Sequence, residues 1–163
     1  MRILGIESSS LVASTAINED GITMAEYTVD FKMPHSQTLL PMIDEMVKFV
    51  GIDLNTIDAI AVSGGPGSFT GLRIGSATAK GLGLALNKPL IHVPTLDATA
   101  YNLFGASGLI CPIMDARRNQ VYTGIYRFEK KFETVMDQDA MDMGELIKKL
   151  NAMGERVIFL GDG

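Results

Sequence analysis

The stretch from Gly64 to Gly75, GGPGSFTGLRIG, constrains the fold more than any other part of this chain. An apolar run, IDAIAVS (57–63), leads into it, and a run of small and apolar residues (72–86) follows. This order predicts a strand, a glycine turn and a helix. Such a junction exposes the first backbone N–H groups of the helix and lacks Cβ atoms that would block a close approach. It therefore suits either a phosphate group or another backbone segment.

The familiar nucleotide motifs do not match this stretch. The Walker pattern requires Lys and Ser or Thr after the last glycine, where this chain has Leu72 and Arg73. The three glycines Gly65, Gly67 and Gly71 miss the dinucleotide-binding spacing by one residue. A tight turn that packs a helix onto a sheet is the simpler alternative, and phosphate contacts at Gly65 and Gly67 stay open.

Composition indicates a globular protein with a core of its own. Of 163 residues, 47% are hydrophobic and 20% charged, and the net charge is −5. An acidic chain has no basic footprint for nucleic acid, so we expect a partner to hold most of any RNA. The single cysteine, Cys111, lies in an apolar run and predicts a buried structural thiol. We expect no signal peptide, no membrane contact and a cytoplasmic location, because the apolar stretches are broken well before about 18 residues.

Hydrophobic periodicity predicts an alternating α/β order. An amphipathic helix is expected between 35 and 50, with Ser36 or Thr38 as its cap. A start at Thr38 fits best, because Pro41 then falls within the first turn. The order β-β-β-α-β-α-β-α is that of a ribonuclease-H-like domain with a mixed sheet. The predicted strands are 2–7, 11–18, 22–30, 57–63 and 89–93, and the predicted helices are 38–50, 72–86 and 96–104.

The rest of the chain begins the same order again. Strands are predicted at 109–115, 120–128, 132–136 and 156–160, with a helix at 143–153. Two such copies define an actin-like architecture, so we predict a first subdomain over 1–106 and a second over 107–163. The second copy lacks the helix, strand and helix that complete the first. We therefore expect the chain to be a shortened version of a longer protein.

Five segments carry a resemblance to a known family. IESSS (6–10), HSQTLLP (35–41), the glycine stretch (64–86), PTLDATA (94–100) and MDARRNQVY (114–122) together closely resemble the TsaB family, also called YeaZ. The resemblance implies a non-catalytic partner of the TsaD subunit in threonylcarbamoylation of the adenosine beside the tRNA anticodon. It further implies a TsaE-like ATPase as a second partner, a homodimer when the chain is alone, and contact with tRNA only through the complex.

The turn after the first strand is a candidate nucleotide contact. In actin-like proteins this carboxylate and hydroxyl turn, here Glu7, Ser8 and Ser9, faces phosphate and metal. Glu7 replaces the usual aspartate, and its extra methylene would disturb the strict octahedral shell of magnesium. We therefore expect no required cofactor, and weak binding of ATP or ADP, with or without magnesium, stays open. Arg117 and Arg118 follow the matching strand of the second copy and are candidates for a nucleotide, RNA backbone or acidic partner contact.

Catalytic and metal-binding residues are not expected. TsaD carries an H-x-x-x-H metal motif where this chain has Thr95 and Thr99. The two histidines, His35 and His92, lie on different elements, and we expect His35 at the surface and His92 in the core. No serine stands in a G-x-S-x-G turn, so a glycoprotease-type peptidase is disfavoured. An actin-like ATPase or small-molecule kinase is the main alternative function.

Two helices are candidates for a partner interface. The helix over 72–86 is apolar on nearly every side, with Arg73 and Lys80 as its only charges, so it must be covered on every side. Family resemblance implies pairing through this helix and the preceding one, with TsaD or with a second copy. The candidate interface residues are Leu39, Met42, Met46, Leu72, Gly75, Ala79 and Gly83.

Overall fold

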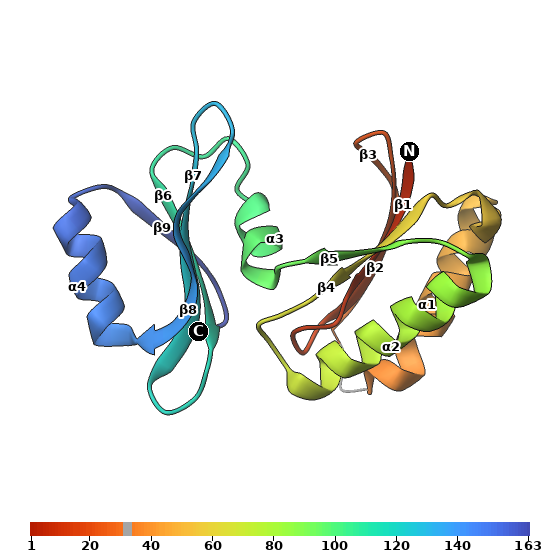
Figure 1. The fold of residues 1–163 in the computed structure, drawn as a ribbon, viewed down its shortest axis with the longest axis horizontal. Helices are drawn as coiled ribbons and strands as arrows, with labels where there is room; N and C mark the ends of the chain where they lie inside the picture. The colour runs from red at the N-terminus through yellow and green to blue at the C-terminus, as the bar shows by residue number, and fades with distance from the viewer. Residues whose placement is uncertain (31–33) are drawn as a thin grey trace. The chain divides into compact units, whose positions relative to one another are not determined.

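The chain forms two compact units, Met1–Pro94 and Thr95–Gly163 (Figure 1). The computed structural model describes residues 1–30 and 34–163. The sequence predicts the boundary after residue 106. In the structure it lies after Pro94. The reason is that helix α3 (Thr95–Tyr101) buries Leu96 and Ala100 against the second sheet.

Unit 1 is a five-stranded mixed sheet with two helices on one face (Figure 1). The sheet order is β3-β2-β1-β4-β5, in which β1, β2 and β3 are antiparallel and β4 and β5 run parallel to β1. The helices α1 and α2 bury Leu39, Ile43 and Ala79 against strand residues such as Leu4 and Ile60. The elements are β1 (Arg2–Glu7), β2 (Ala13–Glu19), β3 (Ile22–Val29), α1 (His35–Val50), β4 (Ala59–Ser63), α2 (Phe69–Leu86) and β5 (Leu90–Val93), with a short 3-10 turn at Leu54–Thr56.

Helix α1 begins about one turn earlier than predicted. It starts at His35, with Pro34 as its N-cap residue and no side-chain cap, so Pro41 lies inside the helix. Pro41 and Gln37 are both exposed, so water can replace the hydrogen bond that Pro41 cannot donate. The helix ends as predicted at Gly51, whose left-handed backbone returns N–H bonds to the last turn.

Unit 2 repeats the first four strand positions of unit 1. Its sheet order is β8-β7-β6-β9, with β7 antiparallel to β6 and β8, and β9 parallel to β6. The internal repeat predicted from the sequence is thus confirmed by the topology. The elements are β6 (Leu109–Asp115), β7 (Gln120–Phe128), β8 (Phe132–Asp142), α4 (Met143–Met153) and β9 (Val157–Gly161).

A helix covers each face of the second sheet. On one face, α4 buries Leu146 and Leu150 against Cys111 and Ile125. On the other, α3 lies over Tyr126, whose hydroxyl donates a 2.8 Å hydrogen bond to Asp97 Oδ1. Burial and this hydrogen bond both raise the pKa of Tyr126 above its ordinary value. None of the helices in the described residues combines the length and apolar character needed to cross a membrane.

Candidate functional site

The glycine stretch of unit 1 packs against the turn that follows β1. A Cβ atom at Gly67 would lie within 3.0 Å of the Ser9 carbonyl oxygen, and one at Gly71 equally close to the Ser8 carbonyl oxygen. The Ser8 hydroxyl donates a 3.0 Å hydrogen bond to the carbonyl oxygen of Gly71. Of the two alternatives in the sequence, close approach of another backbone segment is therefore the one that the structure shows.

Two of the backbone N–H groups that could hold a phosphate at this junction are already used. The Ser68 N–H donates to the Ser9 carbonyl oxygen at 2.6 Å, and the Gly71 N–H donates to the capping Ser68 hydroxyl at 3.2 Å. Ser8 and Ser9 are buried, and the Glu7 carboxylate accepts the Ser9 N–H. Carbonyl oxygens fill the cradle, so the residues present do not fit a phosphate between Gly67 and the Ser8–Ser9 turn.

The other predicted nucleotide contacts lie apart in the chain. Gly65 has a left-handed φ of 104° and lies in the loop before α2. Arg117 and Arg118 are exposed in the β6–β7 turn of unit 2.

The small-residue stripe of α2 faces the sheet. A Cβ atom at Gly75 would lie within 3.0 Å of the Ser8 hydroxyl oxygen, and one at Gly83 would lie 2.8 Å from Leu90 Cδ2. Ala79, between them, is completely buried. Small side chains therefore bring α2 close to the strands, and the prediction that Gly75, Ala79 and Gly83 form a partner interface is wrong.

The predicted interface residues of α1 are also buried within unit 1. Leu39 is 1%, Met42 6% and Met46 0% exposed, because these side chains form the core between α1 and the sheet. They are unavailable to a partner, which corrects the sequence prediction. Leu72 alone of the predicted set is partly exposed.

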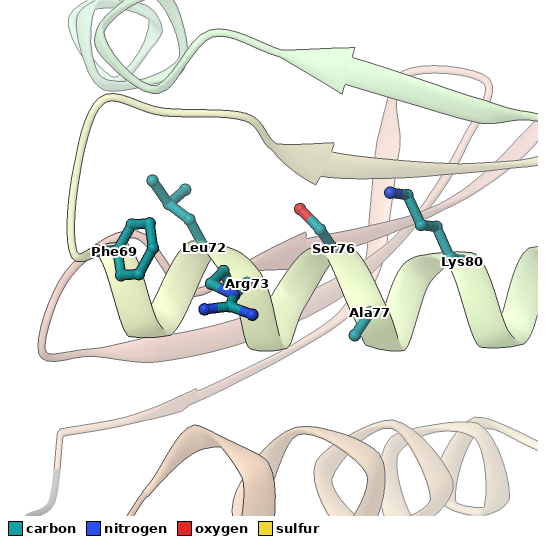
Figure 2. A pocket seen from close by; sticks show the side chains of 6 residues that line it. All are labelled: Phe69, Leu72, Arg73, Ser76, Ala77 and Lys80. Atoms are coloured by element: carbon teal, nitrogen blue, oxygen red, sulfur yellow. The ribbon is translucent and has the colours of Figure 1, made fainter.

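The opposite face of α2 is open. Two rows of side chains at four-residue spacing run along it, Phe69, Arg73, Ala77 and Leu72, Ser76, Lys80, and line a shallow depression of about 410 Å³ (Figure 2). Phe69 is 74% exposed, and the Arg73 guanidinium carbon lies 5.3 Å from the centre of its ring. One turn beyond Lys80, Leu84 is 87% exposed. We call the six lining residues and Leu84 the outer face of α2.

This outer face combines apolar surface with positive charge. Arg73 and Lys80 are its charged groups, and the sequence of α2 contains no acidic residue. Neither cation forms a salt bridge within the described part of the chain, so both are available to carboxylates of a partner. The sequence held the signal for this face, because Arg73 and Lys80 lie two turns apart on one side of the helix.

The remaining sequence candidates have local structural roles. His35 Nε2 donates a 2.9 Å hydrogen bond to the Ser10 carbonyl oxygen, which ties α1 to the β1–β2 turn. His92 is exposed beside Gly64 and is not the core residue that the sequence predicted. Cys111 is buried next to the Thr123 hydroxyl, and burial raises the pKa of its thiol, as expected for a structural cysteine. The Thr99 hydroxyl donates to the Thr95 carbonyl oxygen at 2.8 Å.

Comparison with known proteins assigns the family. The family model described as TsaD, tRNA N6-adenosine threonylcarbamoyltransferase, matches residues 30–158. The tRNA threonylcarbamoyladenosine biosynthesis protein TsaB of Bacillus subtilis is 35% identical over an alignment of 163 positions, which covers 99% of this chain and 71% of that protein. The chain belongs to the TsaB family. TsaB of Escherichia coli is 36% identical over 78% of this chain, and the match spans 55% of its own length.

Solved structures agree with the family and with the predicted fold. YeaZ from Pseudomonas aeruginosa superposes with a TM-score of 0.76 at 30% identity, covering 86% of this TsaB chain and 66% of that chain. A ROK hexokinase from Thermus thermophilus superposes with a TM-score of 0.51 at 14% identity and shares the fold alone. The actin-like fold predicted from the order of elements is thus confirmed. The chain spans about half to two thirds of the length of several of these relatives.

Proposed function

We propose that this TsaB chain is the non-catalytic partner of a TsaD-type subunit in threonylcarbamoylation of the adenosine next to the tRNA anticodon. The observation that carries the proposal is the outer face of α2, which is apolar, positively charged and uncovered in unit 1. The names of the curated relatives support the pathway. We further propose a TsaE-type ATPase as a second partner and contact with tRNA through the complex. This role places the chain in the cytoplasm.

The spacing of the outer face suits a helix as the binding partner. Side chains four residues apart form ridges, and the groove between two such ridges accepts a ridge from another helix. In α2 one ridge is Phe69, Arg73 and Ala77 and the other is Leu72, Ser76 and Lys80 (Figure 2). A complementary helix carries apolar residues for the groove and carboxylates for Arg73 and Lys80. We propose that TsaD supplies this helix, and that a second copy of the chain occupies the groove when TsaD is missing.

Substitution of Ala77 by Glu tests this interface. Ala77 is exposed in the groove, so the change leaves the fold intact but places a carboxylate in an apolar contact. We expect the affinity for the TsaD-type subunit to fall about a hundredfold, which corresponds to about 3 kcal/mol. Sedimentation velocity of mixtures with that subunit measures the loss.

The control is the same substitution at Ala85, which is exposed on α2 but does not line the depression. Ala85→Glu is expected to bind almost as the unchanged chain does. Equal binding by both variants would place the partner surface elsewhere. Both variants are also compared in a reconstituted reaction that measures modified adenosine. Loss of the modification with Ala77→Glu but not with Ala85→Glu would connect the interface with the function.

We also propose that the chain needs no nucleotide for this role. The cradle between Gly67 and the Ser8–Ser9 turn is filled by carbonyl oxygens, which repel a phosphate. Calorimetric titration of ATP with magnesium into the isolated chain is expected to show binding no tighter than about 1 mM, the affinity of a weak and unspecific contact. Micromolar binding with turnover would instead favour the ATPase or kinase alternative.

A further inference from the structure

The β6–β7 turn of unit 2 has an unusual backbone. Three consecutive residues other than glycine, Arg117, Arg118 and Asn119, have positive φ angles of 65°, 53° and 63°. Asparagine tolerates the left-handed region, but a side chain such as arginine is disfavoured there. A tight turn alone would be better served by glycine or asparagine at 117 and 118. The turn therefore does not explain why these two residues are arginines.

Hydrogen bonds from its neighbours hold the turn in this conformation. The Arg117 N–H donates to Asp115 Oδ1 at 2.7 Å, and the Gln120 N–H donates to the Arg117 carbonyl oxygen at 3.0 Å. The Asn119 side chain donates a 3.0 Å hydrogen bond to Asp142 Oδ2. Asp142 also caps α4 through the N–H groups of Gly144 and Glu145. The turn is therefore anchored to the start of a helix.

The same bonds occupy the carboxylates nearest to the turn. The Asn119 amide and the N–H groups of the α4 cap hold the pKa of Asp142 below its ordinary value, so this side chain is a carboxylate at neutral pH. Asp142 and Asp115 are thus engaged by the backbone and by Asn119. Within the described part of the chain, neither carboxylate forms an ion pair with the two arginines.

The two guanidinium groups have no ion-pair partner among the described residues. Both arginines are exposed, and within the described residues neither forms a salt bridge, whereas Arg2 pairs with Glu19 and Arg127 with Glu155. A chain with 14 cationic and 19 acidic side chains thus holds two adjacent arginines unpaired on an anchored turn. Such groups are available for bidentate bonds to oxyanions.

We infer that the β6–β7 turn of this chain contacts the phosphodiester backbone of RNA. The planar guanidinium matches two phosphate oxygens, and phosphate contacts fix the orientation of a nucleic acid without reading its sequence. Strand β8 carries Asp137 and Asp139 beyond the turn, so the cationic surface is small and suits one or two phosphates. The inference rests on the proposed function, because that function supplies tRNA as the RNA.

The test uses the full chain in complex with its TsaD-type subunit and unmodified tRNA. Substitution of both arginines by glutamine, Arg117→Gln with Arg118→Gln, is expected to raise the Kd for tRNA about five- to tenfold at about 0.1 M salt. The slope of log affinity against log salt concentration is expected to fall by about one. Replacement of both by lysine keeps the charge but removes the forked geometry, and it is expected to recover only part of the affinity.

The matched control removes two charges from the other hairpin turn of the same sheet. Lys130 and Lys131 are exposed in the β7–β8 turn, and their double substitution by glutamine is expected to change the Kd less than about twofold. A fall in affinity of equal size in both double variants would show a general charge effect and overturn the inference. Unchanged tRNA affinity of the arginine variant would do the same.

Other results separate the sources of failure. If the arginine variant loses affinity for the TsaD-type subunit in sedimentation, the turn contacts protein carboxylates and the RNA contact is refuted. If it loses affinity for ATP or inorganic phosphate while tRNA binding is unchanged, the turn serves a small phosphate and the inference is again refuted. If the complex with the unchanged chain neither binds nor modifies tRNA, the proposed function itself fails. Glycine readily adopts the positive φ angle of residue 118, so an Arg118→Gly variant is expected to be at least as stable as the unchanged chain. A loss of tRNA affinity in this variant therefore does not come from lost folding.

Discussion

Substitution of Ala79 by Glu is expected to unfold unit 1 of this TsaB chain. Ala79 is completely buried between α2 and the sheet, in the same core cluster as Ile60 and Val62. A carboxylate there would lose its hydration without gaining an ion pair, and a longer side chain would push α2 away from the strands. We expect a loss of about 5 kcal/mol of unfolding free energy, comparable with the whole stability of many domains.

Ala77→Glu is the matched control, because it makes the same chemical change two residues away on the exposed side of α2. Circular dichroism during thermal unfolding should show the full transition for Ala77→Glu, whereas Ala79→Glu should have less regular secondary structure from the start and should lack the part of the transition that belongs to unit 1. A folded Ala79→Glu variant that had only lost its partner would contradict the structure. Such a result would show that Ala79 belongs to the partner interface, as the sequence predicts.

The sequence predicted the order of elements because hydrophobic period and turn residues are local signals. Strands 2–7, 109–115 and 120–128 and the helix over 143–153 lie where their patterns placed them. Boundaries failed where the deciding partner is distant in sequence. Strand β8 continues to Asp142 and not to residue 136, because it pairs with β7 as far as Gln120.

The interface prediction failed because it took the wrong side of α2. Small residues allow a helix to approach any neighbour closely, and the pattern does not say whether that neighbour is a sheet or another protein. The two charged residues of α2 do indicate which side of the helix faces the sheet. Arg73 and Lys80 must reach solvent or a partner, so the stripe of Gly75, Ala79 and Gly83 on the other side had to face the sheet.

The candidate site contains features that no local pattern could have shown. The backbone segment that packs against the glycine stretch is the turn after β1. It lies there because β1 pairs in parallel with β4, which leads into the glycine stretch. The left-handed turn at Arg117–Asn119 depends on Asp142, which is distant in sequence and caps α4. Motif spacing described the glycine stretch as a turn but left its contact open.

Gly71 and Gly81 of the same helix give the sharpest test of that contact. In an exposed helix, replacing glycine by alanine stabilises by about 1 kcal/mol, because alanine loses less conformational entropy. Gly81 is exposed and a Cβ atom there would meet nothing within 4 Å, so Gly81→Ala should raise the unfolding free energy by about 0.5–1 kcal/mol.

Gly71→Ala should do the opposite. Its Cβ atom would collide with the buried Ser8 carbonyl oxygen, which belongs to the backbone and cannot turn aside as a side chain would. Separation of α2 from the β1–β2 turn would also break the bond from the Ser8 hydroxyl to the Gly71 carbonyl oxygen. We expect Gly71→Ala to lower the unfolding free energy by about 3 kcal/mol, the upper range of overpacking in a core. Urea denaturation of both variants measures the two changes in unfolding free energy, which are expected to have opposite signs. Stabilisation by Gly71→Ala would show that the close backbone approach is absent and that the cradle has room for a ligand.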